Sequence, residues 1–202
     1  MTPRSTIIIL TVLAASCSYS DKDFNLNENE RSFLSVFKTG TILYYENSKN
    51  QVDSFLVIGI DSTQKKESGY LMALPAFNNI FVSIKHLPVD SFISTNQDMT
   101  TKKIDTVHEQ LICVSKHPQQ KETSFSFQFK RFFYYTKNGL GQLHSDTIIN
   151  NIRLTNYYII KDNFVDRDTS YVKIEQLYWT QKDGLVAYKQ KNGIYWTKKN
   201  SR

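Results

Sequence analysis

The chain contains 202 residues, enough for one or two domains with a hydrophobic core. Hydrophobic residues make up 40% of it and charged residues 22%, a balance that is typical of globular proteins and excludes a disordered chain. With only two cysteines, the chain cannot form a disulfide-rich scaffold or a four-cysteine zinc site. Aromatic residues reach 13%, and this content favours β-strands.

The N-terminus has the features of a secretory signal. Arg4 gives it a positive charge, residues 7–13 are apolar, and small residues follow at positions 14–16. A segment of this kind directs export and is removed from the mature protein. Its apolar stretch is too short to span a bilayer as a stable helix.

The small residues lead directly to a cysteine. The sequence Ala14-Ala15-Ser16-Cys17 resembles the lipobox of bacterial lipoproteins, although Ala14 stands where Leu is usual. The resemblance implies that residues 1–16 are a signal peptide and that Cys17 is the lipidation site, through which acyl chains anchor the protein in a membrane. The alternative is an ordinary signal peptide that leaves Cys17 as a free thiol.

Cleavage before Cys17 would leave 186 of the 202 residues and would lower the net charge from +6 to +5, because Arg4 is lost. Residues 17–27 are polar and form a predicted tether. Asp21 and Asp23 within it resemble the acidic surface-export signal of lipoproteins of the Bacteroidota, interrupted here by Lys22. The alternative is a plain tether that leaves the protein facing the periplasm.

One helix is predicted, over residues 28–38. Asn27 can cap its start, and Glu28 and Glu30 suit the positive end of a helix dipole. Apolar residues at positions 33, 34 and 37 form one stripe along this segment. We expect a short helix that packs against an end or an edge of a sheet.

From residue 41 onward the pattern predicts strands. The clearest is at residues 124–135, where Phe125, Phe127 and Phe129 alternate with polar side chains and therefore share one face. Residues 147–160 form one long or two short strands. The other predicted strands lie at residues 41–46, 52–61, 70–74, 80–84, 104–115, 171–180, 185–190 and 194–198.

Turn dipeptides separate the last strands. Asp183-Gly184 and Asn192-Gly193 are typical of hairpin turns, and we expect a positive φ at Gly193. The fold predicted for residues 28–202 is therefore a single, mainly β domain. It is an antiparallel meander in the form of a curled sheet or partial barrel, with one short N-terminal helix.

Pairs of adjacent aromatic residues recur within the predicted strands. Because successive side chains of a strand point to opposite faces, each pair places one ring on each face of the sheet. Either both faces are covered, or the second face is an aromatic binding surface. The pairs are Tyr44-Tyr45, Phe132-Phe133, Tyr134-Tyr135, Tyr157-Tyr158 and Tyr178-Trp179.

The C-terminal residues 174–196 resemble the ending of small uncharacterised lipoproteins of the Bacteroidota. These often close with a strand, a turn, a Gly-Leu-containing strand that ends in Tyr, and a Gly-x-x-Trp motif. The corresponding residues here are 184–188 and 193–196, and residues 38–44 resemble the early first strand of the same group. The resemblance implies a lineage and carries no catalytic residue.

No set of residues points to catalysis, a cofactor or a metal. His108, Cys113 and His117 have metal-like spacing, but positions 108 and 113 face opposite sides of a strand. The acidic loop at residues 162–170 lacks the glycine and the terminal Glu of a calcium loop. Phosphate and dinucleotide motifs are absent, and the dispersed charge does not favour binding to nucleic acid.

These patterns predict an exported envelope protein that Cys17 anchors in a membrane, most simply the outer membrane, and that acts as a non-enzymatic binding or structural module. One alternative is an accessory subunit that docks on an envelope protein complex through an aromatic sheet face. An enzyme of unknown class is a third interpretation. The sequence leaves the ligand and the oligomeric state open.

Overall fold

The computed structural model describes residues 25–65, 77–87, 108–117, 122–130, 132–137, 139–162 and 173–199. The predicted tether up to residue 24 and the predicted strand at residues 70–74 lie outside these ranges. None of the helices in the described ranges has the length and apolar character that are needed to cross a membrane. The elements are α1 (Glu28–Ser32), β1 (Ile42–Asn47), β2 (Val52–Lys65), β3 (Phe77–Leu87), β4 (His108–Lys116), β5 (Ser124–Phe129), β6 (Phe132–Thr136), β7 (Leu143–Ile149), β8 (Ile152–Lys161), β9 (Ile174–Thr180), β10 (Gly184–Gln190) and β11 (Tyr195–Lys199).

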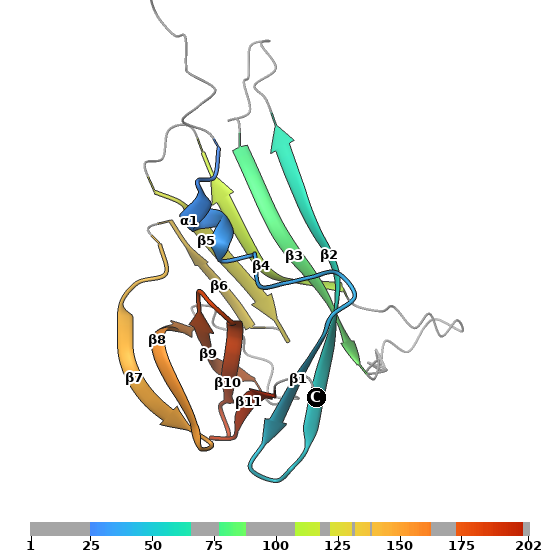
Figure 1. Ribbon diagram of the computed structural model, residues 1–202, viewed down its shortest axis with the longest axis vertical. Coiled ribbons are helices and arrows are strands. Elements are labelled where there is room, and N and C mark those ends of the chain that lie inside the picture. The colour runs from blue at the N-terminus through green and yellow to red at the C-terminus, as the bar shows by residue number, and fades with distance from the viewer. Residues whose placement is uncertain are drawn as a thin grey trace, which may run out of the picture.

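All the strands belong to one antiparallel sheet with the order β6-β5-β4-β3-β2-β1-β11-β10-β9-β8-β7. The sheet consists of two meanders, β1–β6 and β7–β11, that are joined where β1 pairs with β11 (Figure 1). In that pairing Tyr44 lies opposite Lys199. The prediction of a mainly β, antiparallel fold with one short N-terminal helix is confirmed.

The sheet curls into a half-barrel, and its core lies between the two meanders. The ring of Phe127 on β5 contacts that of Trp179 on β9, with centroids 5.1 Å apart, although six strands separate β5 from β9 in the sheet. Phe129 likewise contacts Tyr188 of β10, at 5.1 Å. A flat sheet could not bring these rings together, so burial of aromatic side chains on the concave face stabilises the curl.

The N-terminal helix is capped as predicted. The side chain of Asn27 accepts a hydrogen bond from the backbone N–H of Glu30 at 2.9 Å, and Glu30 accepts one from the backbone N–H of Asn27 at 2.6 Å. This reciprocal pair is a capping box, which satisfies two backbone donors that would otherwise lack partners.

The prediction of a helix over residues 28–38 was wrong about its length, because α1 ends at Ser32. Beyond it the chain continues in turns that direct two aromatic rings to different parts of the core. Phe33 contacts Phe125 of β5 at 5.2 Å, and Phe37 contacts Trp179 of β9 at 5.7 Å. Burial of both rings outweighs the hydrogen bonds that a longer helix would gain.

The predicted strand at residues 124–135 is in fact a hairpin of β5 and β6, with Phe129 paired to Phe132. The chain reverses at Lys130, whose φ is +48°, a value that usually signals Asn or Gly. The turn contains none of the residues that usually mark a turn in a sequence, so the pattern predicted one strand where the structure has two. The faces were predicted correctly, since Phe125, Phe127 and Phe129 are all buried.

The turn between β10 and β11 has the predicted positive φ, +83°, at Gly193. Its N–H donates to the carbonyl of Gln190 at 2.9 Å, and the N–H of Gln190 donates to the carbonyl of Ile194, also at 2.9 Å. Asn192 keeps a negative φ. The turn is therefore longer than the two-residue type in which both central residues have positive φ.

We expect Gly193→Val to lower the free energy of unfolding by about 1 kcal/mol or more, because a β-branched residue is strained at positive φ. A Cβ there would meet no atom within 4 Å, so any effect comes from the backbone and not from a clash. Gly193→Asn is the control, because Asn tolerates this region. Thermal unfolding of the variants measures this loss of stability. Equal unfolding midpoints for Gly193→Val and the wild type would contradict the prediction.

The aromatic pairs differ in how far their rings are buried. Tyr157, Tyr178 and their neighbours Val186 and Ala187 form a second buried cluster, so rings on both faces are covered at β8–β10. On the edge strand β6, by contrast, Phe133 and Tyr135 are 43% and 41% exposed. The rings of β8–β10 are therefore covered on both faces, whereas β6 leaves two rings partly exposed.

Candidate functional site

A buried carboxylate stands out on the concave face. Asp53 lies on β2 in alternation with Phe55 and Val57, so all three side chains point into the half-barrel. Its side chain is 5% exposed. A buried charge is costly unless it is paired and hydrogen-bonded, so its partners define the site.

Three side chains donate to this carboxylate. His86 Nε2 lies 2.5 Å from Asp53 Oδ1, and Lys130 Nζ lies 2.6 Å from Oδ2. The hydroxyl of Tyr188 also donates to Oδ2. Both oxygens of Asp53 are therefore engaged, one by an imidazole and the other by an ammonium and a phenol.

The donors come from parts of the sheet that are distant in strand order. His86 lies on β3 next to β2, Lys130 is in the β5–β6 turn, and Tyr188 is on β10. Asp53 thus links both meanders across the concave face. The Lys130 turn has a further support, since its backbone N–H donates to Glu109 Oε2 at 2.9 Å.

Aromatic rings surround the cluster. Phe55 stacks on the imidazole of His86 with centroids 4.9 Å apart, and Lys130 Nζ lies 5.4 Å from the centre of the same ring. Tyr188 stacks on Trp196 at 5.8 Å. The hydroxyl of Tyr45 donates to the carbonyl of Leu185 at 2.9 Å. These contacts hold the donors in place and shield their charges from water.

Burial and the hydrogen bonds act on the pKa of Asp53 in opposite directions. Desolvation raises this pKa. The hydrogen bond from His86, together with the charge and hydrogen bond of Lys130, lowers it by a larger amount, so the pKa of Asp53 lies below its ordinary value. Burial first, and the negative charge of Asp53 second, raise the pKa of Tyr188 and of Tyr45. Asp53 is therefore a carboxylate, and both tyrosines are neutral donors, at neutral pH.

This arrangement is suited to holding the fold and not to proton transfer by Asp53. A general base needs an oxygen that faces a substrate, whereas both oxygens of Asp53 accept bonds from protein donors. The side chains of His86 and Lys130 are 22% and 27% exposed, so they form the accessible rim of the cluster.

The residues that the sequence singled out do not meet. Cys17 lies outside the described residues. His108 is exposed at the start of β4, whereas Cys113 is buried in the same strand. In the described ranges, no three His, Cys, Asp or Glu side chains are grouped so that they could hold a metal ion.

Sequence reasoning missed the cluster around Asp53. One signal was available, since Asp53 precedes Phe55 and Val57 at strand spacing and is therefore an acidic residue on an apolar face. His86, Lys130 and Tyr188 carry no such signal, because their meeting depends on the curl of the sheet.

In comparisons with known proteins, no family model, no curated protein and no solved structure matches this chain.

Proposed function

We propose that this protein is an exported envelope protein, anchored in the outer membrane by lipid on Cys17, and that its β domain is a non-enzymatic binding or structural module. The observation that carries the proposal is the sequence Ala14-Ala15-Ser16-Cys17 after a positively charged and apolar segment. Two or three acyl chains on one cysteine give durable membrane attachment, since each buried methylene contributes about 0.8 kcal/mol.

The structure of the body is compatible with an anchor of this kind. The capped helix α1 begins at Glu28, and Leu26, just before it, is already 3% exposed within the core. Residues 17–25 would therefore connect the lipid to a folded domain directly. A tether of this length holds the domain close to the bilayer surface.

The polar cluster supports a binding or structural role over an enzymatic one. Asp53 is the buried acid of the concave face, and protein donors occupy both of its oxygens. What the cluster presents outward is the rim formed by His86 and Lys130. Such a rim can donate hydrogen bonds to a ligand.

We expect Cys17→Ala to abolish incorporation of labelled palmitate and to move the protein from the membrane fraction to the soluble fraction, because the thioether site is lost. Cys113→Ala is the control, since Cys113 is a buried thiol on β4 and its loss should leave membrane attachment unchanged. Labelling and fractionation of the two variants check this. A Cys17→Ala variant that still fractionates with membranes would rule out the anchor.

A second candidate function is that of an accessory subunit that docks on an envelope protein complex. The observation that favours it is the exposure of Phe133 and Tyr135 on the edge strand β6, because exposed aromatic rings are enriched in protein interfaces. Affinity capture of the intact protein from its own envelope, compared with a Phe133→Ser/Tyr135→Ser variant, distinguishes the candidates. A protein retained only by the wild type favours docking through β6.

A further inference from the structure

The first described residues are fixed to the body of the protein. Leu26 is 3% exposed, and its carbonyl accepts a hydrogen bond from Arg31 Nε at 2.9 Å. Lys116, at the end of β4, forms a salt bridge with Glu30, with Nζ and Oε1 3.3 Å apart, and it also donates to the carbonyl of Asn25 at 3.5 Å. Any chain that leads to Asn25 is therefore attached to this end of the sheet.

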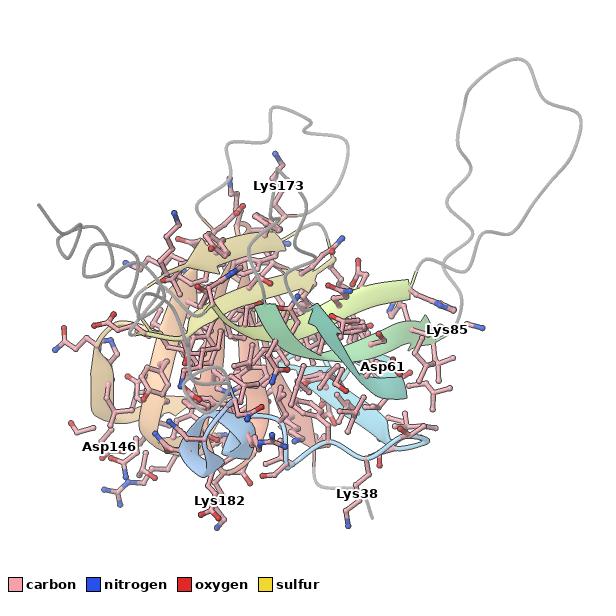
Figure 2. The ribbon with its side chains drawn as sticks, turned by 90° about the horizontal axis from the view of Figure 1, so that it is seen from above. Lys38, Asp61, Lys85, Asp146, Lys173 and Lys182 are labelled. Carbon is pink, nitrogen blue, oxygen red and sulfur yellow. The ribbon has the colours of Figure 1, made fainter. Side chains whose placement is uncertain are left out.

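Contacts of α1 extend to both meanders. The hydroxyl of Thr123, just before β5, donates to Glu30. On the other side, Gln181 in the β9–β10 turn donates to Asn29 at 2.7 Å, and Figure 2 shows Lys182 of that turn on the same side of the body as α1. Because α1 is attached to both halves of the sheet, a tether that pulls on α1 orients the whole domain.

The Asp53 cluster lies at the opposite end of the half-barrel. Strand β5 connects the two ends, because Thr123 before it bonds to Glu30 and Lys130 after it bonds to Asp53. Thr123 and Lys130 are seven residues apart in the sequence, so about 23 Å of extended strand separates them. The β1–β2 turn, at residues 48–51, extends about 10 Å beyond Asp53 at the same rise, at the lower end of the body in Figure 1.

We propose that the domain stands on the membrane with its α1 end towards the lipid, so that the rim of His86 and Lys130 faces away from the membrane. The inference rests on the proposed anchor at Cys17. Eight peptide units separate Cys17 from Asn25, and even when fully extended they reach at most about 28 Å. The inverted orientation would place Asn25 about 33 Å from the membrane surface, beyond this reach.

The side chains at the α1 end suit contact with lipid headgroups and not insertion. Asn25, Glu28, Asn29 and Arg31 are exposed, and they carry one charge of each sign. Among the described residues, the large apolar side chains that are exposed all lie elsewhere, from Tyr44 onward. Neither burial in the bilayer nor attraction to anionic lipid therefore sets the orientation, which leaves the length of the tether as its cause.

This orientation restricts what the rim can bind. The side chains of His86 and Lys130 are 22% and 27% exposed, so a ligand can reach them. With the α1 end on the membrane, the rim lies about 23 Å above that end and does not touch the headgroups of the bilayer that holds Cys17. Its ligand is therefore a molecule in solution or on an opposing surface.

Quenching of fluorescence by lipid headgroups tests the orientation. The full lipidated protein, with Cys113→Ala to remove the second thiol, is placed in phosphatidylcholine vesicles that carry a nitroxide on the headgroup. A fluorophore is attached at Glu122→Cys, beside the α1 end, or at Ser48→Cys in the β1–β2 turn, both of which are exposed positions. We expect severalfold stronger quenching at position 122. Equal quenching at the two positions, or a difference that appears only with anionic lipid, overturns the proposal.

A longer tether is the matched variant. About twenty Gly and Ser residues inserted after Asp23 add roughly 66 Å of extended chain, enough for the inverted orientation, so the difference between positions 122 and 48 should disappear. A difference that persists would show that the tether does not orient the domain. Flotation of the same vesicles tests the anchor separately, because protein that does not float with them lacks lipid on Cys17. That result would overturn the proposed function, whereas equal quenching of floating protein overturns the orientation alone.

Discussion

Truncation of Phe127 to Ala is expected to lower the free energy of unfolding by about 3–5 kcal/mol. Phe127 lies in the middle of β5, is fully buried, and contacts Trp179 across the half-barrel at 5.1 Å and Tyr134 of β6 at 6.3 Å. Its removal leaves a cavity between the two meanders, where neither can collapse without moving the other. A loss of this size is a large share of the stability of a typical domain.

Chemical denaturation of Phe127→Ala and Gln128→Ala measures the effect. Gln128 is the next residue on β5 and is exposed on the opposite face, so its truncation should change the free energy of unfolding by less than about 0.5 kcal/mol. A Phe127→Ala variant as stable as wild type would contradict the assignment of this row to the core. If that variant also lost a partner in affinity capture, the row would instead be a binding surface.

Replacement of Asp53 by Ala is expected to destabilise the protein by about 3 kcal/mol, because it leaves His86, Lys130 and Tyr188 without their common acceptor. The loss falls on one of the contacts that join the two meanders, the hydrogen bond between Asp53 and Tyr188. Asp146→Ala is the matched control, since Asp146 also pairs with a basic residue, Arg153, but at the surface. Solvent screens such a pair, so its loss should leave the denaturation midpoint close to that of wild type.

The contribution of Asp53 to the free energy of unfolding should also depend on pH, and it should decrease in acid. Its pKa is lower in the folded state than in the unfolded state, so the unfolded state binds more protons in acid and stability rises with pH there. The stabilisation is complete above the ordinary carboxyl pKa of about 4 and is lost as the pH falls through the lowered pKa.

The measurement is the difference in free energy of unfolding between wild type and Asp53→Asn, followed with pH. This difference should be constant from about pH 5 to pH 7 and should shrink below about pH 4. A difference that grew on acidification would show that the folded-state pKa is raised, and that the hydrogen bonds do not outweigh burial.

Alternation along the strands was readable from the sequence because it is a local property. The alternation of side chains along a strand placed Phe125, Phe127 and Phe129 on one face. The side chain of Asn27 is short and polar, so it could cap the start of α1. The turns at residues 183–184 and 192–193 contain glycine and were predicted for that reason. The turn at Lys130 contains no such residue, and its conformation depends on Asp53 and Glu109, which lie elsewhere in the chain.

Local chemistry in the sequence was therefore enough for the class of fold, the faces of β5 and the capped start of α1, but not for the break at Lys130 or the end of the helix. The pairing of β1 with β11, the curl and the meeting of Asp53 with Lys130 and Tyr188 were decided only in the tertiary structure. The physical reason is that these contacts join residues 77 and 135 positions apart. They form only when aromatic side chains from both meanders are buried together, and no local pattern records which distant strand will supply the partner.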